Sequence, residues 1–244
     1  MKVTLLVPTL NEYESMIKVM PLIDKSCCDQ ILVVDGGSKD GTVEWAQSQG
    51  YEVIIQKKKG LRQAYLEALD YIKGDVIITF SPDGNSLADR IPLLVTKMKE
   101  GYDMVIVSRY LPPASSQDDD LLTGFGNWFF TKLINVLHKA KYTDTFVMFR
   151  GYRKSLLLEL DLLSDRGYRT PERLFKTKIP VEPLLSVRAA RRKCKISEIP
   201  GDEPARIGGV RKLEMFRWGL GFLYQIIREV FPQRSYYASV VDGK

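Results

Sequence analysis

Short apolar runs rich in valine and isoleucine alternate with segments of helical period through the first part of the chain. The apolar runs occupy residues 3–7, 31–34, 52–55, 75–80 and 104–107, and the helical segments occupy residues 14–23, 42–49, 61–72 and 87–99. This alternation is typical of βαβ units. It predicts an α/β fold with a mostly parallel, Rossmann-like central sheet that helices flank on its faces.

The pattern changes after Leu111, where a segment rich in proline, serine and aspartate predicts a polar, flexible loop. A long amphipathic helix follows this loop. Its apolar side chains Phe125, Phe129, Leu133 and Val136 are spaced to share one face of a helix. We expect that face to be buried.

Two further strands are expected at residues 143–149 and 195–199, and a loop at residues 200–209 contains glycine and charged residues that suit closure over a ligand. A C-terminal amphipathic helix follows. Its apolar seam consists of Phe216, Leu220, Leu223, Ile227 and Val230. Such a helix either packs on protein, in the core or in a dimer, or lies in the headgroup region of a membrane.

The length of 244 residues and the hydrophobic content of 45% suit one domain spanning residues 1–244. The three cysteines have neither zinc-ligand spacing nor the density of a disulfide scaffold. The first strand begins at Lys2-Val3 without a secretory signal, and the apolar stretches are too short to cross a bilayer. We therefore expect a cytoplasmic protein, either free or peripheral at the inner face of the membrane.

Basic residues exceed acidic ones, which gives a formal net charge of +6. They gather at residues 57–59 and 188–195. This excess indicates anionic partners such as diphosphates, acidic glycans or an anionic leaflet, although solvated surfaces explain many of the charges. Nucleic acid is not expected, because residues 57–59 have no adjacent aromatic side chains on which bases would stack.

Two carboxylates follow buried strands directly. Asp35 ends the run at 31–34 and precedes the turn-forming residues 36–42, and Asp83 follows the run at 75–80 and precedes Gly84. Ligands of open α/β sheets bind beyond the carboxyl ends of the strands. One acid there can accept hydrogen bonds from a base or ribose, and the other can hold a hard divalent cation against phosphates. The pair suits a sugar nucleotide.

Motifs along most of the chain resemble, in order and spacing, those of the family 2 glycosyltransferases with the GT-A fold. The nearest branch is similar to the polyprenyl-phosphate sugar synthases, which include dolichyl-phosphate mannose synthase. The resemblance covers residues 3–212 and rests on Pro8-Thr9-Leu10-Asn11-Glu12, Val34-Asp35-Gly36-Gly37-Ser38, Asp40-Gly41-Thr42, Ser81-Pro82-Asp83-Gly84-Asn85, Ser108-Arg109-Tyr110, Asp144-Thr145, Phe149-Arg150, Glu198-Ile199-Pro200 and residues 206–212.

The resemblance implies a nucleotide-sugar site built from Pro8, Asn11, Glu12, Asp35, Arg62, Ser81 and Asp83. Pro8 would shape the turn after the first strand, and Glu12 and Asp35 would accept hydrogen bonds from the nucleoside. Arg62 would face the diphosphate, for which the forked guanidinium is suited. Two alternatives stay open: Glu12 as a favourable acid at a helix N-terminus, and Arg62 as a solvated residue in a first helical turn.

The metal motif departs from the family, because its Asp-x-Asp is Ser81-Pro82-Asp83 here. The resemblance implies that Asp83 binds Mg²⁺ or Mn²⁺ and that the amide oxygen of Asn85 assists. Such a cation needs only one or two protein ligands besides phosphate oxygens and water, so the loss of one acid need not abolish the site. Asp83 is also the residue expected to be essential for catalysis.

On the acceptor side, the resemblance implies an anion-binding group consisting of Arg109, Arg150, Arg206, Arg211 and Lys212. Glu182 is the candidate general base, which a hydroxyl acceptor needs and a phosphate acceptor does not. Its alternative is an acid at a helix N-terminus. Asp144 is a candidate for catalysis or for a structural salt bridge to Arg150. His138, the only histidine, is given no chemistry.

These expectations divide the chain into a nucleotide-sugar half at about residues 1–110, an acceptor half at about 111–212, and a C-terminal helix and tail at about 213–244. The leading hypothesis is inverting transfer of a hexose from a UDP- or GDP-linked donor to a polyprenyl phosphate. The alternatives are transfer to a sugar hydroxyl of lipopolysaccharide or another cell-surface glycan, and a non-catalytic protein that binds nucleotides or anions. A homo-oligomer is compatible with each of them.

Overall fold

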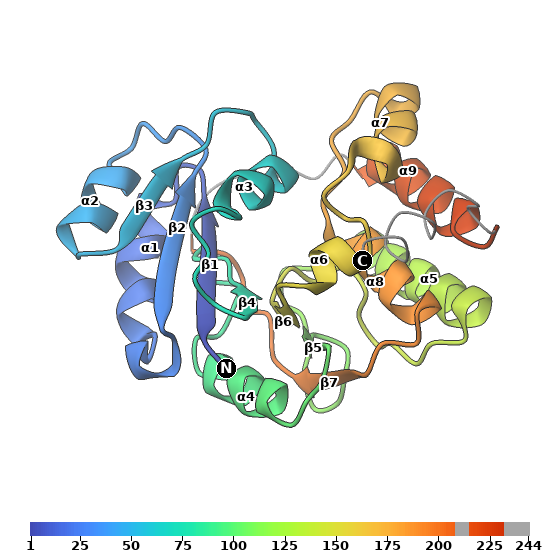
Figure 1. Ribbon diagram of the computed structural model, residues 1–244, viewed down its shortest axis with the longest axis horizontal. Coiled ribbons are helices and arrows are strands. Elements are labelled where there is room, and N and C mark those ends of the chain that lie inside the picture. The colour runs from blue at the N-terminus through green and yellow to red at the C-terminus, as the bar shows by residue number, and fades with distance from the viewer. Residues whose placement is uncertain (208–214, 232–244) are drawn as a thin grey trace, which may run out of the picture.

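The computed structural model describes residues 1–207 and 215–231, and its centre is a seven-stranded sheet with the order β3-β2-β1-β4-β6-β5-β7 (Figure 1). Within the sheet, β6 runs antiparallel to both of its neighbours and the other pairings are parallel. The strands are β1 (Val3–Thr9), β2 (Gln30–Asp35), β3 (Glu52–Ile55), β4 (Val76–Thr79), β5 (Met104–Ser108), β6 (Arg150–Arg153) and β7 (Ile196–Pro200).

Helices cover both faces of this sheet. The helices are α1 (Tyr13–Val19), α2 (Thr42–Ser48), α3 (Leu61–Ala68), α4 (Arg90–Lys99), α5 (Leu121–His138), α6 (Leu156–Glu159), α7 (Arg169–Phe175), α8 (Glu182–Arg191) and α9 (Met215–Arg228). Short 3-10 turns occupy Met20–Leu22, Lys25–Cys27 and Asp165–Gly167. The predicted α/β architecture is confirmed, with each strand of the first half within two residues of its expected bounds.

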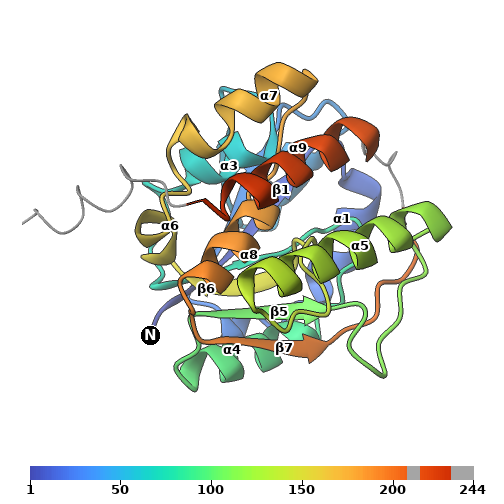
Figure 2. The same cartoon turned by 90° about the vertical axis from the view of Figure 1, so that its right-hand side faces the viewer.

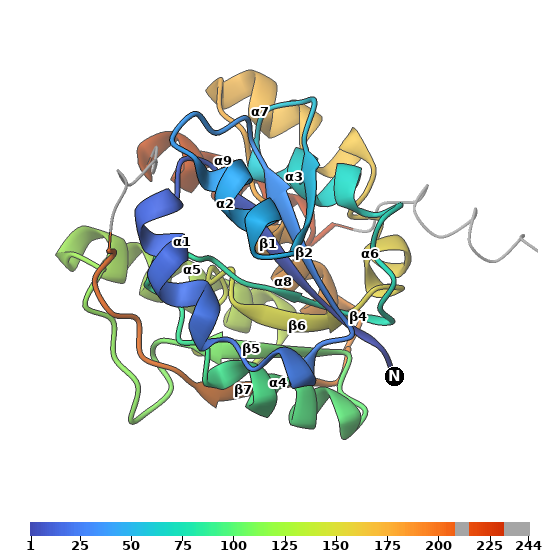
Figure 3. The same cartoon turned by 90° about the vertical axis from the view of Figure 1, so that its left-hand side faces the viewer.

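Two hydrophobic cores result from this arrangement. One lies between the sheet and helices α1, α2 and α4, and Figure 3 shows α1 and α2 on that side. The other lies between the sheet and helices α3, α5, α6, α8 and α9, and Figure 2 shows α5, α8 and α9 side by side on that face. Because strands β1 and β4 are buried on both faces, their sequences are almost continuously apolar.

The strand predicted at residues 143–149 is wrong, because β6 begins only at Arg150. Asp144 folds this segment into a turn: its Oδ1 accepts hydrogen bonds from the backbone N–H groups of Phe146 and Val147, both at 3.2 Å. The carboxylate of Glu198 binds the same segment through the N–H of Thr143, at 2.9 Å. Local bonds from carboxylates compete with a strand ladder, and here they replace it.

The predicted buried face of α5 is largely exposed. The side chains of Phe125 and Val136 are 60% and 75% exposed, whereas Asn127, Thr131 and Ile134 are buried. Polar partners explain the inversion, since Thr131 shares a hydrogen bond of 2.9 Å with Thr145.

The last helix shows the same inversion. Phe216 is 79% exposed, whereas Phe222, Gln225 and Ile226 are buried against the neighbouring helices. The exposed seam of α9 therefore remains available for contact with something outside the described residues. Across residues 1–207 and 215–231, none of the helices has the length and apolar character that a bilayer span requires.

Candidate functional site

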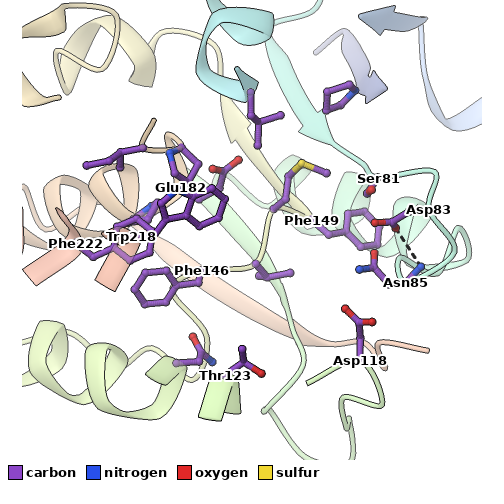
Figure 4. A pocket seen from close by; sticks show the side chains of 18 of the residues that line it. Ser81, Asp83, Asn85, Asp118, Thr123, Phe146, Phe149, Glu182, Trp218 and Phe222 are labelled. Carbon is purple, nitrogen blue, oxygen red and sulfur yellow. Dashed lines mark hydrogen bonds between the residues drawn. The ribbon is translucent and has the colours of Figure 1, made fainter. Parts of the chain in front are cut away.

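One large pocket lies at the carboxyl ends of the parallel strands and has a volume of about 1010 Å³. It extends from the ends of β1, β2 and β4 to the helices α5 and α9. Its lining includes Pro8, Glu12, Gly36, Gly37, Arg62, Ser81, Asp83, Asn85, Arg109, Asp118, Phe125, Phe146, Glu182, Glu203, Arg206, Phe216, Trp218 and Phe222. Figure 4 shows Asp83 at one end of this space and Phe222 and Trp218 at the other.

Asp35 shapes the wall of the pocket beside the first strands. Its side chain is fully buried, and its Oδ1 accepts hydrogen bonds from the N–H groups of Gly37 at 2.8 Å and Ser38 at 2.7 Å. Its Oδ2 accepts from Thr9 Oγ1 at 2.9 Å. The carboxylate thus fixes the turn whose glycines, Gly36 and Gly37, face the pocket.

The loop after β1 has two different tasks. Asn11 has a φ of 56°, in the left-handed region that asparagine tolerates, and its Oδ1 accepts from the N–H of Lys39 at 2.9 Å. It thereby ties the two strand-end loops together. Pro8 and Glu12 line the pocket, and Glu12 also accepts from Ser15 Oγ at 3.1 Å in the first turn of α1. Glu12 therefore lies at the N-terminus of α1 and also lines the pocket, which is compatible with either predicted role, as a ligand contact or as a helix N-terminal acid.

Asp83 is buried, with 3% of its surface exposed, and yet it lines the pocket. Its Oδ1 accepts from the N–H of Asn85 at 3.2 Å, and its Oδ2 lies 3.0 Å from Nη1 of Arg206. Ser81 and Asn85 line the same end. The described residues contain no cluster of three or more His, Cys, Asp or Glu side chains that could hold a metal by themselves.

This donor set nevertheless fits Mg²⁺ or Mn²⁺. Asp83 and Asn85 offer carboxylate and amide oxygens, the hard ligands that these ions prefer, and phosphates and water can supply the remainder. The guanidinium of Arg206 against Asp83 also shows that a positive charge is accommodated at this point.

Arg62 lines the pocket but is already paired. Its Nη1 lies 2.8 Å from Oδ1 of Asp165, its Nη2 lies 3.6 Å from Oε2 of Glu172, and its guanidinium stacks on Tyr168 at 4.3 Å. The side chain of Arg62 is only 6% exposed. These contacts hold α3 against α7 and the turn before it, so a diphosphate would have to share Arg62 with two carboxylates.

Arg109 is the centre of a buried ionic group. Its Nε lies 2.6 Å from Asp144, and its Nη1 lies 3.1 Å from Glu203 and 3.6 Å from Asp119. Burial alone would raise the pKa of Asp144, but the charge and hydrogen bonds of Arg109 hold that pKa below its usual value. The salt-bridge partner of Asp144 is therefore Arg109, and the predicted pairing with Arg150 is wrong.

Arg150 begins β6 and is not among the residues that line the pocket. It is fully buried, and its guanidinium donates to the carbonyl oxygens of Val147 and Thr145 and to Ser186 Oγ. A guanidinium committed in this way supports the fold. Two other predicted anion-binding residues, Arg211 and Lys212, lie outside the described residues, whereas Arg206 lines the pocket.

Glu182 begins α8 and lines the middle of the pocket (Figure 4). It is 3% exposed, and its Oε1 accepts from the hydroxyl of Tyr65 at 2.8 Å. Burial raises the pKa of Glu182, and the nearby charge of Arg150 opposes that rise only in part. Glu182 is an acid at a helix N-terminus, and it also faces the pocket. Its position is therefore compatible with either predicted role, as a general base or as a helix N-terminal acid.

Sequence reasoning missed much of the lining. Asp118 was placed in a polar loop, yet it faces the same space as Asp83 and Asn85 (Figure 4). The aromatic wall of Phe146, Trp218 and Phe222 was also missed, although the rings of Phe146 and Phe222 lie 4.9 Å apart. The excess of aromatic residues in the last helix was the signal in the sequence, but nothing local showed which side they would line.

The fold is of the GT-A type, and the sequence comparisons identify the family of the chain. Residues 4–161 match the family described as Glycosyl transferase family 2. The chain belongs to that family, so the predicted membership is confirmed and the protein is a glycosyltransferase.

Curated relatives include proteins of archaea and bacteria. The chain is 28% identical over 231 residues to the glycosyltransferase AglJ of Haloferax volcanii, covering 88% of this chain and 71% of that protein. It is 27% identical over 168 residues to the undecaprenyl-phosphate 4-deoxy-4-formamido-L-arabinose transferase of Klebsiella pneumoniae, covering 64% and 50%. The protein of that name in Salmonella paratyphi B is 26% identical over 238 residues, covering 93% and 66%. The chain thus spans about half to seven tenths of these relatives.

Solved structures show the same fold. The glucosyl-3-phosphoglycerate synthase of Mycobacterium tuberculosis, in complex with Mn²⁺, UDP and glucosyl-3-phosphoglycerate, superposes with a TM-score of 0.63 at 18% identity, covering 94% of this chain and 80% of that one. Its complex with Mg²⁺ and UDP gives a TM-score of 0.64 at 17% identity, covering 94% and 79%. At these identities the likeness establishes the fold.

Proposed function

We propose that this protein is an inverting, metal-dependent glycosyltransferase that moves a hexose from a UDP- or GDP-linked sugar to the phosphate of a polyprenyl phosphate at a membrane surface. One observation carries this proposal. A single pocket joins a polar end, which contains Asp83, to an aromatic end that opens between α5 and α9. An acceptor that is an anion at one end and a hydrocarbon at the other matches this division.

The polar end suits the donor. Pro8, Glu12 and the glycines after Asp35 form the wall against which a nucleoside would lie, and Asp83 with Asn85 would hold Mg²⁺ or Mn²⁺. When bound, the cation neutralises the charge that grows on the departing nucleoside diphosphate. The residues of the chain orient the donor so that its anomeric carbon faces the acceptor half of the pocket.

The apolar end suits a prenyl chain. Phe146, Trp218 and Phe222 line it from inside, and the exposed side chains at its mouth include Leu122, Phe125, Phe129, Phe216 and Leu220. Contiguous exposed apolar surface marks interaction sites in proteins. A lipid chain that left the pocket between α5 and α9 would meet this surface, and the same side chains would bring the enzyme to the membrane.

A phosphate acceptor removes the need for a general base, because its oxygen is already ionised at neutral pH. Transfer to a sugar hydroxyl is the second candidate, and Glu182 favours it. Its carboxyl group faces the pocket and has a raised pKa, as a general base near neutrality requires. The names of the Klebsiella and Salmonella relatives, which specify undecaprenyl phosphate, support the first candidate.

The test offers purified protein both kinds of acceptor. UDP- and GDP-hexoses would be supplied with Mn²⁺ and with undecaprenyl phosphate, undecaprenol or a soluble oligosaccharide. We expect a sugar phosphodiester to form only with undecaprenyl phosphate, and farnesyl phosphate to react less well because it fills less of the apolar end. If the sugar were transferred only to the oligosaccharide, and if Glu182→Gln abolished that transfer, the sugar-hydroxyl acceptor would replace the polyprenyl phosphate as the first candidate.

A further inference from the structure

The guanidinium of Arg206 lies between two carboxylates from different loops. Its Nη1 lies 3.0 Å from Oδ2 of Asp83, and its Nε lies 3.4 Å from Oδ2 of Asp118. The side chains of Asp83 and Asp118 are only 4% and 16% exposed, and all three residues line the pocket. One guanidinium therefore spans the gap between the two carboxylate oxygens.

Two poorly solvated carboxylates that share one guanidinium favour a positive charge between them. Arg206 provides one positive charge but only hydrogen-bond donors, so it cannot complete a coordination shell. A divalent cation doubles the charge at that position and binds carboxylate oxygens directly. The position that Arg206 occupies thus has the ligands and the charge that such an ion needs.

Backbone hydrogen bonds anchor the segment just before Asp118. The N–H of Gln117 donates to the carbonyl oxygen of Glu203 at 2.8 Å, and the N–H of Glu203 donates to the carbonyl oxygen of Ser115 at 2.9 Å. In turn, the N–H of Ile207 donates to the carbonyl oxygen of Asp83 at 3.0 Å. The loop of Asp118, the loop of Arg206 and the turn of Asp83 therefore form one connected unit.

Gly84 shows how closely these loops approach. A Cβ atom at Gly84 would lie 2.5 Å from Cγ1 of Ile207, and the φ of Gly84 is 92°. Only glycine fits both the backbone conformation and the contact. The turn next to Asp83 thus accommodates the loop that carries Arg206. This close packing keeps Arg206 positioned between Asp83 and Asp118.

We propose that Asp118 is the second carboxylate of the divalent-cation site and replaces the family aspartate whose position Ser81 occupies. Arg206 takes the place of the cation until the metal and the nucleoside diphosphate bind. On metal binding, Arg206 leaves the two carboxylates and becomes available to the diphosphate. The inference rests on the metal dependence of the proposed function. It assigns the missing family ligand to a loop in the acceptor half of the chain.

The first experiment measures Mn²⁺ binding without any acceptor. Free Mn²⁺ would be followed by electron paramagnetic resonance as protein is added, with and without UDP, for the wild type and for Asp118→Asn. We expect Asp118→Asn to weaken Mn²⁺ binding by on the order of tenfold, since affinity follows the number of charged ligands. The matched control is Asp89→Asn, because the side chain of Asp89 is exposed and lies outside the pocket lining, so Mn²⁺ affinity is expected to stay unchanged.

The same titration distinguishes two roles of Asp118, as a ligand of the metal or only as a salt-bridge partner of Arg206. If Asp118 only paired with Arg206, Asp118→Asn would leave Mn²⁺ binding unchanged or strengthen it, and that result would overturn the proposal. Restoring an acid at position 81, in the double variant Ser81→Asp with Asp118→Asn, should recover the affinity. A double variant that bound no better than Asp118→Asn would also contradict it. Thermal unfolding of each variant checks that the fold is intact.

Arg206→Gln tests the stand-in. Without the competing guanidinium, Mn²⁺ should bind more tightly in the absence of UDP, and unchanged affinity would overturn that part of the proposal. Asp83→Asn distinguishes this inference from the proposed function. If Asp83→Asn retained Mn²⁺ binding, the proposed metal site itself would be wrong. If Asp83→Asn lost binding and Asp118→Asn did not, only the assignment of Asp118 would fail.

Discussion

The two ends of the pocket are built in opposite ways. At the donor end, Asp35 is held by the N–H groups of Gly37 and Ser38, and Asp83 by that of Asn85, so each acid is fixed by its own turn. At the apolar end, Phe146 packs on Phe222 from α9, far away in the sequence. The conformation of each acid at the polar end is therefore set by its own turn, whereas the aromatic end arises from long-range packing.

Charge is also used differently in the two regions. Asp83 lines the pocket and lies 3.0 Å from the guanidinium of Arg206, which is proposed to leave when a metal binds. Elsewhere, Arg109 and Arg188 are buried with the carboxylates of Asp144 and Glu229, at 2.6 Å and 2.8 Å. Buried pairs of this kind are costly to break, since removing one partner leaves a charge without compensation. The first arrangement serves binding, and the second holds the scaffold.

The largest effect is expected from breaking the scaffold. Arg109→Gln would leave Asp144 buried without its cation, and we expect the free energy of unfolding to fall by about 3–5 kcal/mol. Urea unfolding monitored by circular dichroism measures this change. Arg153→Gln is the control, because Arg153 is 38% exposed, and loss of its exposed ion pairs should cost less than about 1 kcal/mol. Equal losses in both variants would remove the distinction between scaffold and surface charges.

The second effect concerns the donor end alone. Asp83→Ala should reduce the rate of transfer by about 10²- to 10³-fold, because charge on the leaving diphosphate would no longer be neutralised through this residue. Initial rates at saturating Mn²⁺ would measure the loss. Asp70→Ala, a change of an exposed acid after α3, should leave the rate unchanged. A rate within threefold of wild type in Asp83→Ala would contradict the assignment of this end to the donor.

The third effect concerns the apolar end. Phe125→Ser and Phe216→Ser remove side chains that are 60% and 79% exposed beside the pocket. If these rings enter a membrane, each change should weaken binding to vesicles by about tenfold, since burying such a side chain contributes about 1.5 kcal/mol or more. Sedimentation with phosphatidylglycerol vesicles measures the change. Leu22→Ser, at a side chain that is 72% exposed next to α1, is the control, and an equal loss there would contradict the proposed membrane face.

The smallest expected effect concerns Glu182, which lies between the two ends of the pocket. Because burial raises its pKa in the folded protein, folding favours the protonated carboxyl group. The stability of the wild type should therefore fall as pH rises from the ordinary pKa of glutamate to the raised pKa. Glu182→Gln lacks this titration. The difference in melting temperature between Glu182→Gln and the wild type should therefore shift in favour of the variant as pH rises from 4 to 8. A constant difference would show that Glu182 does not titrate in this way.

The turn chemistry of the donor end was readable from the sequence. An aspartate that follows a buried apolar run and precedes a glycine favours a turn at the end of a strand. Asp35 is the last residue of β2, and Asp83 lies in the loop that follows β4. The alternation of strands and helices was equally readable, because a parallel sheet buried on both faces requires continuous apolar strands. These features depend on interactions between residues within a few positions of one another.

Other features required the tertiary structure. Helical periodicity showed that α5 and α9 have apolar faces, but it could not show that Phe125 and Phe216 face outward while Asn127 and Gln225 are buried, since a buried polar side chain depends on partners from distant elements. For the same reason Arg150 was predicted as the salt-bridge partner of Asp144, whereas the partner is Arg109. The α/β fold and the strand-end positions of Asp35 and Asp83 follow from the order of residues along the chain. Only long-range packing decided which surface stays apolar and exposed, and which acid lies opposite Asp83.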